Sequence, residues 1–271
     1  MSVVDGVDER VRRAGRPAAG SAPVASPTAV GLDLGSGYAR MWASGRALAQ
    51  TASINDSLTN PVRPVRRGRI SDPAGLSEVL TRLLGQQHPA VPAGAVVVAC
   101  RPVLATAEEL SVTRKLLDAA LAPSRVLFID TVRAAAIGAG AGPGTLLVAD
   151  VGAAVTEVAV LADGSVKAAR RAAIGMSDLL GPVGTEPIVH TIAEFVRDLR
   201  RDPRCRGVSA SAIANGLLMV GGGAGHLALA PRTAATLGLA VRVAGKPRIA
   251  AVHGAGLAAL AALRRNPSAA A

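Results

Sequence analysis

The chain has 271 residues, of which 50% are hydrophobic, so it can bury the core of one large or two modest domains. Its formal net charge of +11 would suit a nucleic acid, yet only 1% of the residues are aromatic and they do not interleave with the basic clusters. We therefore expect no specific nucleic-acid binding. The two cysteines and four histidines are isolated, so they predict neither a disulfide framework nor a metal site nor a Ser/His/Asp arrangement.

Both ends of the chain are expected to be tails. Residues 1–27 are rich in Pro, Ala and Ser and predict a flexible segment, and residues 265–271 predict a second, shorter one. The first segment lacks the apolar core of a signal peptide, and no charge-free apolar run is long enough to span a bilayer. We therefore expect a cytoplasmic protein whose membrane contact is peripheral at most.

The first structured elements are expected to form a hairpin. Residues 28–34, TAVGLDL, predict a strand, and residues 38–44, YARMWAS, predict a second strand after a tight Gly-Ser-Gly turn. In a dinucleotide-binding fingerprint the glycines would instead open a helix, so the pattern argues against that fold. Asp33, near the end of the first strand, is costly to bury unless a charged or hydrogen-bonding group meets it.

Helices and strands alternate after this hairpin. A Pro- and Arg-rich crossing leads to a helix at 73–85, a strand at 95–100, a helix at 107–122, a strand at 125–130 and an Ala-rich helix at 131–140. Thr106 and Glu109 predict a capping box at the start of the second helix. The Ala-rich helix has small side chains on its surface, so it can pack close to a neighbour. The glycines that follow it predict the end of the helix and a hinge-like break between elements.

The opening pattern then returns. Residues 145–175 again predict a strand, an Asp, a Gly-containing turn and a strand, with an Asp-Gly hairpin into a third strand. We therefore predict an α/β fold with two similar halves, residues 28–140 and 141–264, around one cleft. The second half continues with a charged helix at 187–202, a strand at 215–220, a triple glycine at 221–223, and helices at 224–238 and 247–263.

Two Asp-Gly hairpins facing one cleft suit a polyphosphate with a divalent cation. Backbone N–H groups at a turn without side chains can approach phosphate oxygens, and an Asp at the base of the turn can hold the metal, often through water. A glycine-rich turn such as residues 221–223 lets a base and ribose lie against the backbone. The alternative is an ordinary chain reversal, which Asp, Gly and Ser also favour. Because the pattern is repeated, we prefer the phosphate-loop hypothesis.

Five segments in this order resemble the MreB branch of the actin-like ATPase superfamily, which also holds actin, FtsA and DnaK-type chaperones. They are GLDLGSGYARMW, RPVRRGRISD, RAAAIGAG, VADVGAAVTEVAVL and LLMVGGGAG, and the resemblance covers nearly all of residues 28–264. It implies the actin-like ATPase fold, with two ribonuclease H-like halves around a nucleotide cleft. It also implies ATP and Mg²⁺ as cofactors.

The resemblance assigns roles by position. Asp33 and Asp150 would orient water-coordinated magnesium. The remaining assigned residues are Gly35, Ser36 and Gly37 in the first phosphate loop, which Asp33 opens, Gly152 in the second, which Asp150 opens, and Gly221, Gly222 and Gly223 in the adenosine loop.

Two departures from the family pattern weaken the expected chemistry. The family's second loop carries Gly-Gly-Thr where this chain has Ala153, Ala154 and Val155, so added methyl groups obstruct the approach of a phosphate and a hydroxyl is lost. The position of the family's catalytic glutamate matches Thr131. We therefore expect weak ATP binding and slow or absent hydrolysis.

The chain is also short for this family. Few residues separate the first hairpin from the RPVRRG segment, or the GMSDLL segment from the next helix, so both outer subdomains are expected to be reduced or absent. The resemblance implies a bacterial cytoskeletal or cell-shape protein that acts through partners of the cell-shape or division machinery, with self-association as a further possibility. The alternatives are a scaffold that binds no nucleotide and a small-molecule kinase, which would need a general base in the cleft.

Overall fold

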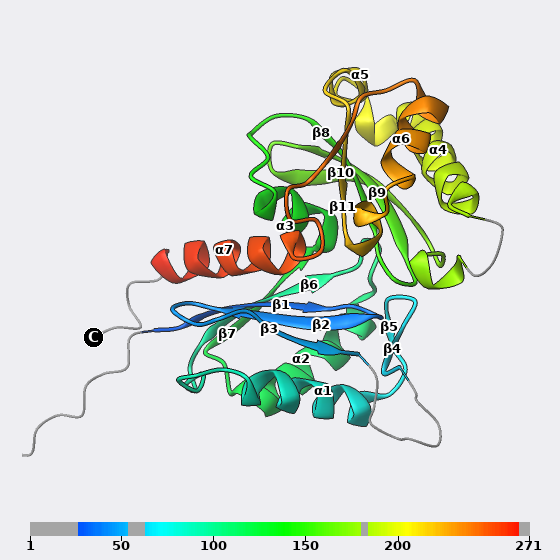
Figure 1. Cartoon of the computed structure of the whole chain (residues 1–271). Coiled ribbons are helices and arrows are strands. Elements are labelled where there is room, and N and C mark those ends of the chain that lie inside the picture. The colour runs from blue at the N-terminus through cyan, green and yellow to red at the C-terminus, as the bar shows by residue number, and fades with distance from the viewer. Residues whose placement is uncertain (1–26, 54–62, 180–183, 266–271) are drawn as a thin grey trace, which may run out of the picture.

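The computed structural model describes residues 27–53, 63–179 and 184–265 of the chain. Nearly all of the two predicted tails, residues 1–26 and 266–271, lies outside the described residues. Within the described part, no helix is long and apolar enough to cross a membrane. Two mixed five-stranded sheets face each other across a pair of helices, and further helices cover the outer faces of the sheets (Figure 1).

The first sheet has the strand order β3-β2-β1-β6-β7. Strands β1 to β3 form an antiparallel meander, and β1, β6 and β7 are parallel. The outer face packs against α1 and α2 through buried leucines on both helices. The bounds are β1 Ala29–Leu34, β2 Tyr38–Ala43, β3 Ala49–Ala52, β6 Val96–Arg101, β7 Arg125–Asp130, α1 Pro73–Gly85 and α2 Ala107–Leu121.

The second sheet repeats this arrangement with the order β10-β9-β8-β11-β12. Its first three strands are again an antiparallel meander, and β8, β11 and β12 are parallel. The same topology in two halves of one chain confirms the predicted internal similarity. The bounds are β8 Leu146–Val151, β9 Thr156–Ala162, β10 Ser165–Ala172, β11 Leu217–Val220, β12 Val241–Val243, α4 Glu186–Arg201, α5 Ser209–Ala214 and α6 Leu229–Leu237.

Helices α3 (Thr131–Gly138) and α7 (Ala250–Arg264) lie between the two sheets and cross in direct backbone contact (Figure 1). A Cβ atom on Gly138 would overlap the carbonyl oxygen of Ala250, and one on Gly254 would overlap that of Ala134. The small residues predicted for close packing are therefore required at this crossing. Although α7 is last in the chain, it packs against β1 and β6 of the first sheet. The division at residues 140 and 141 stays a prediction.

The connections differ from the prediction in three places. The Pro- and Arg-rich crossing contains a small hairpin of β4 (Val65–Arg66) and β5 (Arg69–Ile70). The helix predicted at 224–238 is divided into the 3₁₀ turn η3 (Gly222–Gly225) and α6, because His226 leaves the helical region with ψ of 119°. The edge strands β3 and β12 and the short helix α5 carry too few residues to show a periodic pattern.

The described residues form no outer subdomain in either half. In the first half, β3 ends at Ala52 and β4 begins at Val65, with residues 54–62 outside the description. In the second half, the described residues between β10 and α4 form the 3₁₀ turn η1 (Met176–Asp178), with residues 180–183 outside the description. The reduction or absence of both outer subdomains stays a prediction.

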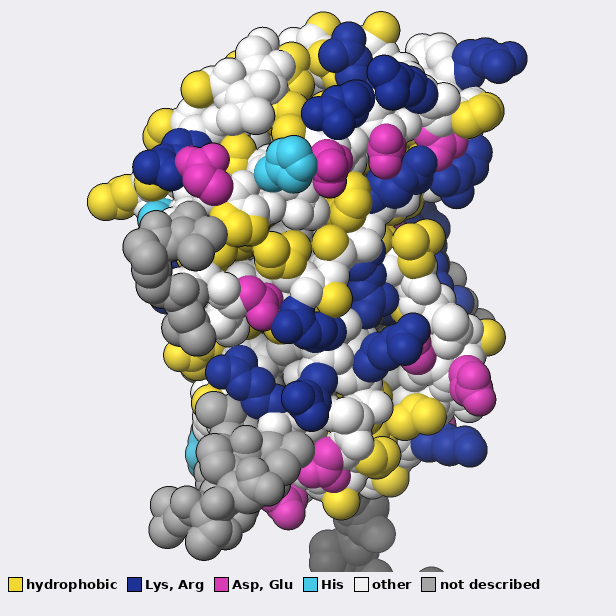
Figure 2. Space-filling view, turned by 90° about the vertical axis from the view of Figure 1, so that its right-hand side faces the viewer, with side chains coloured by type: hydrophobic (Ala, Val, Ile, Leu, Met, Phe, Trp, Pro, Cys, Tyr) yellow, Lys and Arg dark blue, Asp and Glu magenta, His cyan; other side chains and the backbone are white. Residues whose placement is uncertain are grey.

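Basic side chains are spread over the surface. Figure 2 shows Lys and Arg on both halves of one face, with acidic side chains among them. This distribution agrees with solvated charged surfaces rather than a continuous basic groove on that face.

Candidate functional site

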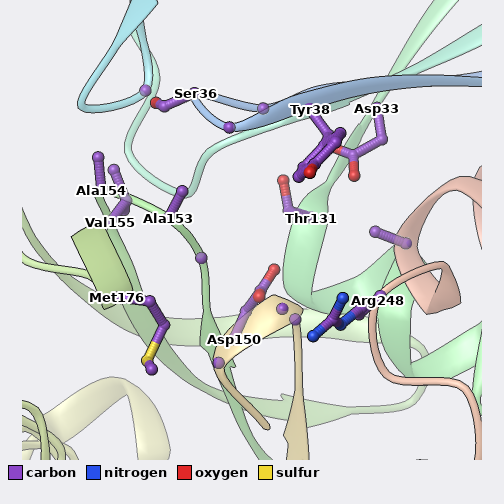
Figure 3. Close-up of a pocket in the computed structure, with 18 of the residues that line it drawn as sticks. Asp33, Ser36, Tyr38, Thr131, Asp150, Ala153, Ala154, Val155, Met176 and Arg248 are labelled. Carbon is purple, nitrogen blue, oxygen red and sulfur yellow. The ribbon is translucent and has the colours of Figure 1, made fainter. Parts of the chain in front are cut away.

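A cavity of about 590 Å³ opens between the two halves. The turn between β1 and β2 and the turn between β8 and β9 both line it. The close-up in Figure 3 shows side chains from both halves pointing into it. Every site residue predicted from the sequence lines this cavity: Asp33, Gly35, Ser36, Gly37, Thr131, Asp150, Gly152, Gly221, Gly222 and Gly223.

The first loop is a tight turn between β1 and β2. The amide of Gly35 donates to the carbonyl oxygen of Tyr38 at 3.1 Å, which closes the hairpin. The guanidinium of Arg63 donates to the carbonyl oxygen of Ser36 at 3.1 Å, so the loop is also held from the side. A Cβ atom on Gly37 would come within 2.9 Å of the Ala153 methyl group, which places the first and second loops almost in contact.

The second loop is held in shape by η1. The amides of Met176 and Ser177 donate to the carbonyl oxygens of Gly152 and Ala153 at 3.0 and 2.7 Å. Ala153 also leaves little room beside Gly175, where an added Cβ atom would lie within 2.5 Å of the Ala153 carbonyl carbon. The methyl groups that replace the family's glycines line the cavity (Figure 3). They reduce the space in which a phosphate could approach the backbone.

The third loop joins β11 to η3. Gly221 has φ of +86°, and a Cβ atom there would overlap a carboxylate oxygen of Asp150. A Cβ atom on Gly223 would overlap the side chain of Val151. By contrast, an added Cβ atom on Gly222 would have no other heavy atom within 4 Å. Two of these glycines are therefore required by packing, and Gly222 alone presents open backbone to the cavity.

The Asp of each repeated hairpin faces a charged residue on the opposite strand. Asp33 pairs with Arg40, and Asp150 pairs with Glu157, in the antiparallel registers of β1/β2 and β8/β9. The Asp33 carboxylate lies 3.8 Å from the Arg40 guanidinium. Side chains at directly opposite positions share one face of a sheet, so both pairs point toward the cavity.

Burial dominates the ionisation of these carboxyl groups. Burial and the Asp33 charge raise the pKa of Asp150 to about 7, although Arg40 opposes the shift. Burial also raises the pKa of Asp33, and Arg40 again opposes it. The pKa of Glu157 lies well above its usual value because of burial and the Asp150 charge, while the Val103 amide donates to its carboxyl oxygen at 2.8 Å. These three carboxyl groups therefore keep their protons to higher pH than exposed carboxyl groups do.

Thr131 is the first residue of α3 and faces the cavity between the two aspartates (Figure 3). Its hydroxyl group donates to the carbonyl oxygen of Arg101 at 2.9 Å. The preceding Asp130 is paired with the Arg101 guanidinium at 3.0 Å and is not among the residues that line the cavity. A hydroxyl whose proton is held by a carbonyl group can accept a hydrogen bond from water, but it is no general base.

Sequence reasoning missed four charged residues that line the cavity. Arg40 and Glu157 could have been found by pairing the strands of each predicted hairpin, since each lies directly across from an Asp. Arg63 and Arg248 had no such signal, because they reach the cavity from segments distant in the chain.

Comparisons with known proteins identify the family and the fold. The family model described as "MreB/Mbl protein" matches residues 28–181. MreB5 of Spiroplasma citri bound to AMPPNP matches with a TM-score of 0.75 and 14% identity, covering 89% of this chain and 98% of that one. The same protein bound to ADP matches with a TM-score of 0.76 and 15% identity, over 90% and 99%.

Two further solved structures share the fold. A structure described as a MamK double helical filament matches with a TM-score of 0.74 and 14% identity, covering 86% of this chain and 99% of that one. The ethanolamine utilization protein EutJ from Carboxydothermus hydrogenoformans matches with a TM-score of 0.56 and 18% identity, over 87% and 91%. A search of curated proteins gave no match. Because the family match spans more than half of the sequence and the fold is shared with MreB5 and MamK, the chain belongs to the MreB/Mbl family of the actin-like ATPase superfamily.

Proposed function

We propose that this protein is a bacterial actin-like protein of the cytoskeleton or of cell-shape control that binds an adenine nucleotide weakly and acts through protein partners. One observation carries the proposal: the three glycine loops predicted to hold phosphate and adenosine line a single cavity between two similar halves. Turns without side chains offer backbone N–H groups to phosphate oxygens. Relatives with this fold are described as bound to AMPPNP and ADP, which supports the same ligand class here.

The expected weakness has two causes. Ala153, Ala154 and Val155 place methyl groups along the second loop, where the family pattern has glycines and a threonine. The reduced outer subdomains leave fewer residues to enclose the base and ribose. Ligand affinity falls when less of the ligand surface is buried, so we expect a dissociation constant well above that of nucleotide-dependent relatives.

Magnesium fits the site poorly. Mg²⁺ prefers ionised oxygen ligands and keeps several of its waters. Burial raises the pKa values of both Asp33 and Asp150, and the Arg40 guanidinium already lies beside Asp33. Among the described residues there is no group of three or more His, Cys, Asp or Glu side chains that could hold a metal ion. Orientation of hydrated magnesium by the two aspartates stays a prediction.

Slow or absent hydrolysis is the second part of the proposal. Thr131 stands at the position of the family's catalytic glutamate, and its proton is held by the Arg101 carbonyl oxygen. Without a carboxylate at this position, the attacking water lacks the group that would take its proton. The protein would then act by the conformation or assembly that the bound nucleotide favours, in the cytoplasm and through partners of the cell-shape or division machinery.

A titration with fluorescent N-methylanthraniloyl-ATP tests the proposal. We expect saturable binding that Gly222→Val abolishes, since a side chain at this open position would fill the cavity without disturbing the fold. Gly85→Val is the matched control, because Gly85 is equally open but lies at the end of α1, away from the cavity. Equal affinity in both variants would place the nucleotide elsewhere.

A scaffold that binds no nucleotide is the second candidate, and the methyl groups of the second loop favour it. The same titration separates the two. Absence of saturable binding to the unmodified protein up to millimolar nucleotide would support the scaffold and reject the nucleotide proposal.

A further inference from the structure

Arg40 holds a fixed place inside the cavity. Its side chain is 11% exposed, and its guanidinium lies 3.8 Å from the Asp33 carboxylate and over the Tyr38 ring, at 5.2 Å from the ring centre. Its Nε atom donates to the side chain of Gln50 on β3 at 2.7 Å. These contacts on several sides hold the cation at the base of the first loop. A surface arginine that merely covers apolar atoms would keep its charge in water instead.

The two halves differ at this position although their backbones are alike. The residue opposite the loop aspartate is the cation Arg40 in the first half and the acid Glu157 in the second. Arg40 acts on both aspartates, because its guanidinium lies 3.8 Å from the Asp33 carboxylate and lines the same cavity as Asp150. A single guanidinium therefore already supplies positive charge to the carboxylates that would otherwise attract a metal ion.

Two further guanidinium groups line the same cavity. Arg63 donates to the Ser36 carbonyl oxygen in the first loop. Arg248 lies in the segment before α7 and is directed toward the region of Asp150 (Figure 3). Guanidinium groups pair with phosphate through parallel N–H donors in a fixed geometry, and they cannot lose their charge near neutral pH. The cavity is thus equipped to receive an anion by direct contact.

We propose that Arg40 supplies the positive charge at the phosphate site in place of a divalent cation, so that the cleft binds a nucleoside di- or triphosphate without magnesium. This inference rests on the proposed nucleotide site. A magnesium ion entering beside Asp33 would approach the Arg40 guanidinium, which Gln50 and Tyr38 hold in place, and like charges repel. The phosphate oxygens would instead take the N–H donors of Arg40 that face the cavity.

The test compares nucleotide affinity with and without magnesium. N-methylanthraniloyl-ADP and N-methylanthraniloyl-ATP are titrated into the full chain in two buffers. One contains about 5 mM MgCl₂, which saturates the nucleotide with magnesium, and the other contains about 5 mM EDTA, which removes magnesium. We expect the two dissociation constants to agree within about threefold. A dissociation constant at least about tenfold higher in EDTA, with binding still sensitive to Gly222→Val, would overturn the inference and leave the proposed function intact. Absence of binding in both buffers would reject both.

Substitution of Arg40 separates a ligand role from a purely structural one. In EDTA we expect Arg40→Gln to weaken binding by about tenfold or more, and Arg40→Lys to retain part of the affinity. Removing the guanidinium also frees Asp33, so Arg40→Gln should gain affinity when magnesium is added. Arg242→Gln, on the edge strand β12, removes the same charge outside the cavity. It should leave the dissociation constant unchanged both in EDTA and in magnesium.

A merely structural Arg40 would give a different pattern. Arg40→Gln would then lower the melting temperature, and its affinity relative to the unmodified protein would not depend on magnesium. That result would overturn the inference. If Arg40→Gln does not fold, Arg40→Lys keeps the test open, because a compact ammonium group should preserve magnesium independence with weaker binding.

Discussion

Arg67 of the β4–β5 hairpin and Asp178 of η1 form an ion pair at 2.8 Å that joins the first half of the molecule to the second. Arg67 also donates to the carbonyl oxygen of Ala173, and Arg171 donates back to the carbonyl oxygen of Arg67 at 2.7 Å. Asp178 accepts the amide of Gly175, next to the residues that hold the second phosphate loop. The hairpin therefore links the two halves of the molecule beside the cavity.

Breaking this tie should loosen the cavity with little loss of stability. Partly exposed ion pairs contribute about 0.2 to 1 kcal/mol, so Arg67→Ala should lower the free energy of unfolding by no more than about that. Hydrogen exchange should increase in residues 63–71 and 173–179 and remain unchanged in α1, which serves as the internal control. Uniform acceleration across the chain would show that the pair stabilises the whole fold instead.

The raised pKa of Asp150 predicts how stability changes with pH. Its pKa is about 7 in the folded protein and 3.8 in the reference state, so the folded protein binds the extra proton between these values. Stability should therefore fall as the pH rises from about 4 through 7, by at most about 4 kcal/mol from this group. Asp150→Asn removes the penalty, and urea unfolding at pH 8 should find it more stable than the unmodified protein. Lower stability of Asp150→Asn at pH 8 would contradict the argument.

The crossing of α3 and α7 should tolerate no side chain. Gly254→Val would push atoms into the Ala134 carbonyl group, and overpacking of this kind costs about 3 kcal/mol. We expect the melting temperature to fall by roughly 6 to 12 °C for a domain of this size. The control Gly85→Val, at an open position, should change it by less than about 3 °C. A similar melting temperature in both variants would mean that the helices can separate cheaply.

Hydrolysis should be restored only by several changes together. Thr131→Glu alone should recover little activity, because the methyl groups of residues 153–155 still obstruct the phosphate. Combining it with Ala153→Gly, Ala154→Gly and Val155→Thr should recover more, toward the 10²- to 10⁴-fold, or roughly 3 to 5 kcal/mol of barrier, that a positioned general base contributes. Phosphate release from the unmodified protein at the rate of active relatives would show that the position of the catalytic group is misassigned.

Assembly provides a further prediction. MamK, which shares the fold, is described as a double helical filament. The described residues of this chain form no outer subdomains, so we expect no double filaments of the MreB type with ATP, although other forms of self-association stay open. Pelleting and electron microscopy at micromolar concentration measure this directly. Double filaments under these conditions would require longitudinal contacts made by the inner halves alone.

Much of the architecture could be predicted because local chemistry determines it. Asp72 caps α1 by accepting the Gly75 amide, and Pro73 occupies the first turn, so the sequence marks the start of this helix clearly. The capping box of Thr106 and Glu109 is confirmed in the same way. The repeated strand, Asp and glycine turn predicted the similar halves, and the family resemblance added the other residues of the cavity, Thr131 and the third glycine loop.

The features that were missed depend on contacts between distant segments. The β4–β5 hairpin turns at Arg67 and Gly68, both with positive φ, and arginine gives no signal for such a turn. Its place is held by Arg171 and Asp178, more than a hundred residues away in the chain. The charge balance of the cavity likewise depends on Arg63 and Arg248, which only the folded chain brings together.

The packing around the third loop determines which of its glycines can indicate nucleotide binding in related sequences. Gly221 leaves room for the Asp150 carboxylate, and Gly223 leaves room for Val151, whether or not any nucleotide is present. A descendant that had lost its ligand altogether would still need both glycines in order to fold. Gly222 is free of such a demand, so in a lineage released from nucleotide binding it should be the first of the three to drift. In related sequences we therefore expect the middle glycine to indicate a functional nucleotide site. The presence of Gly221 and Gly223 indicates only a shared fold.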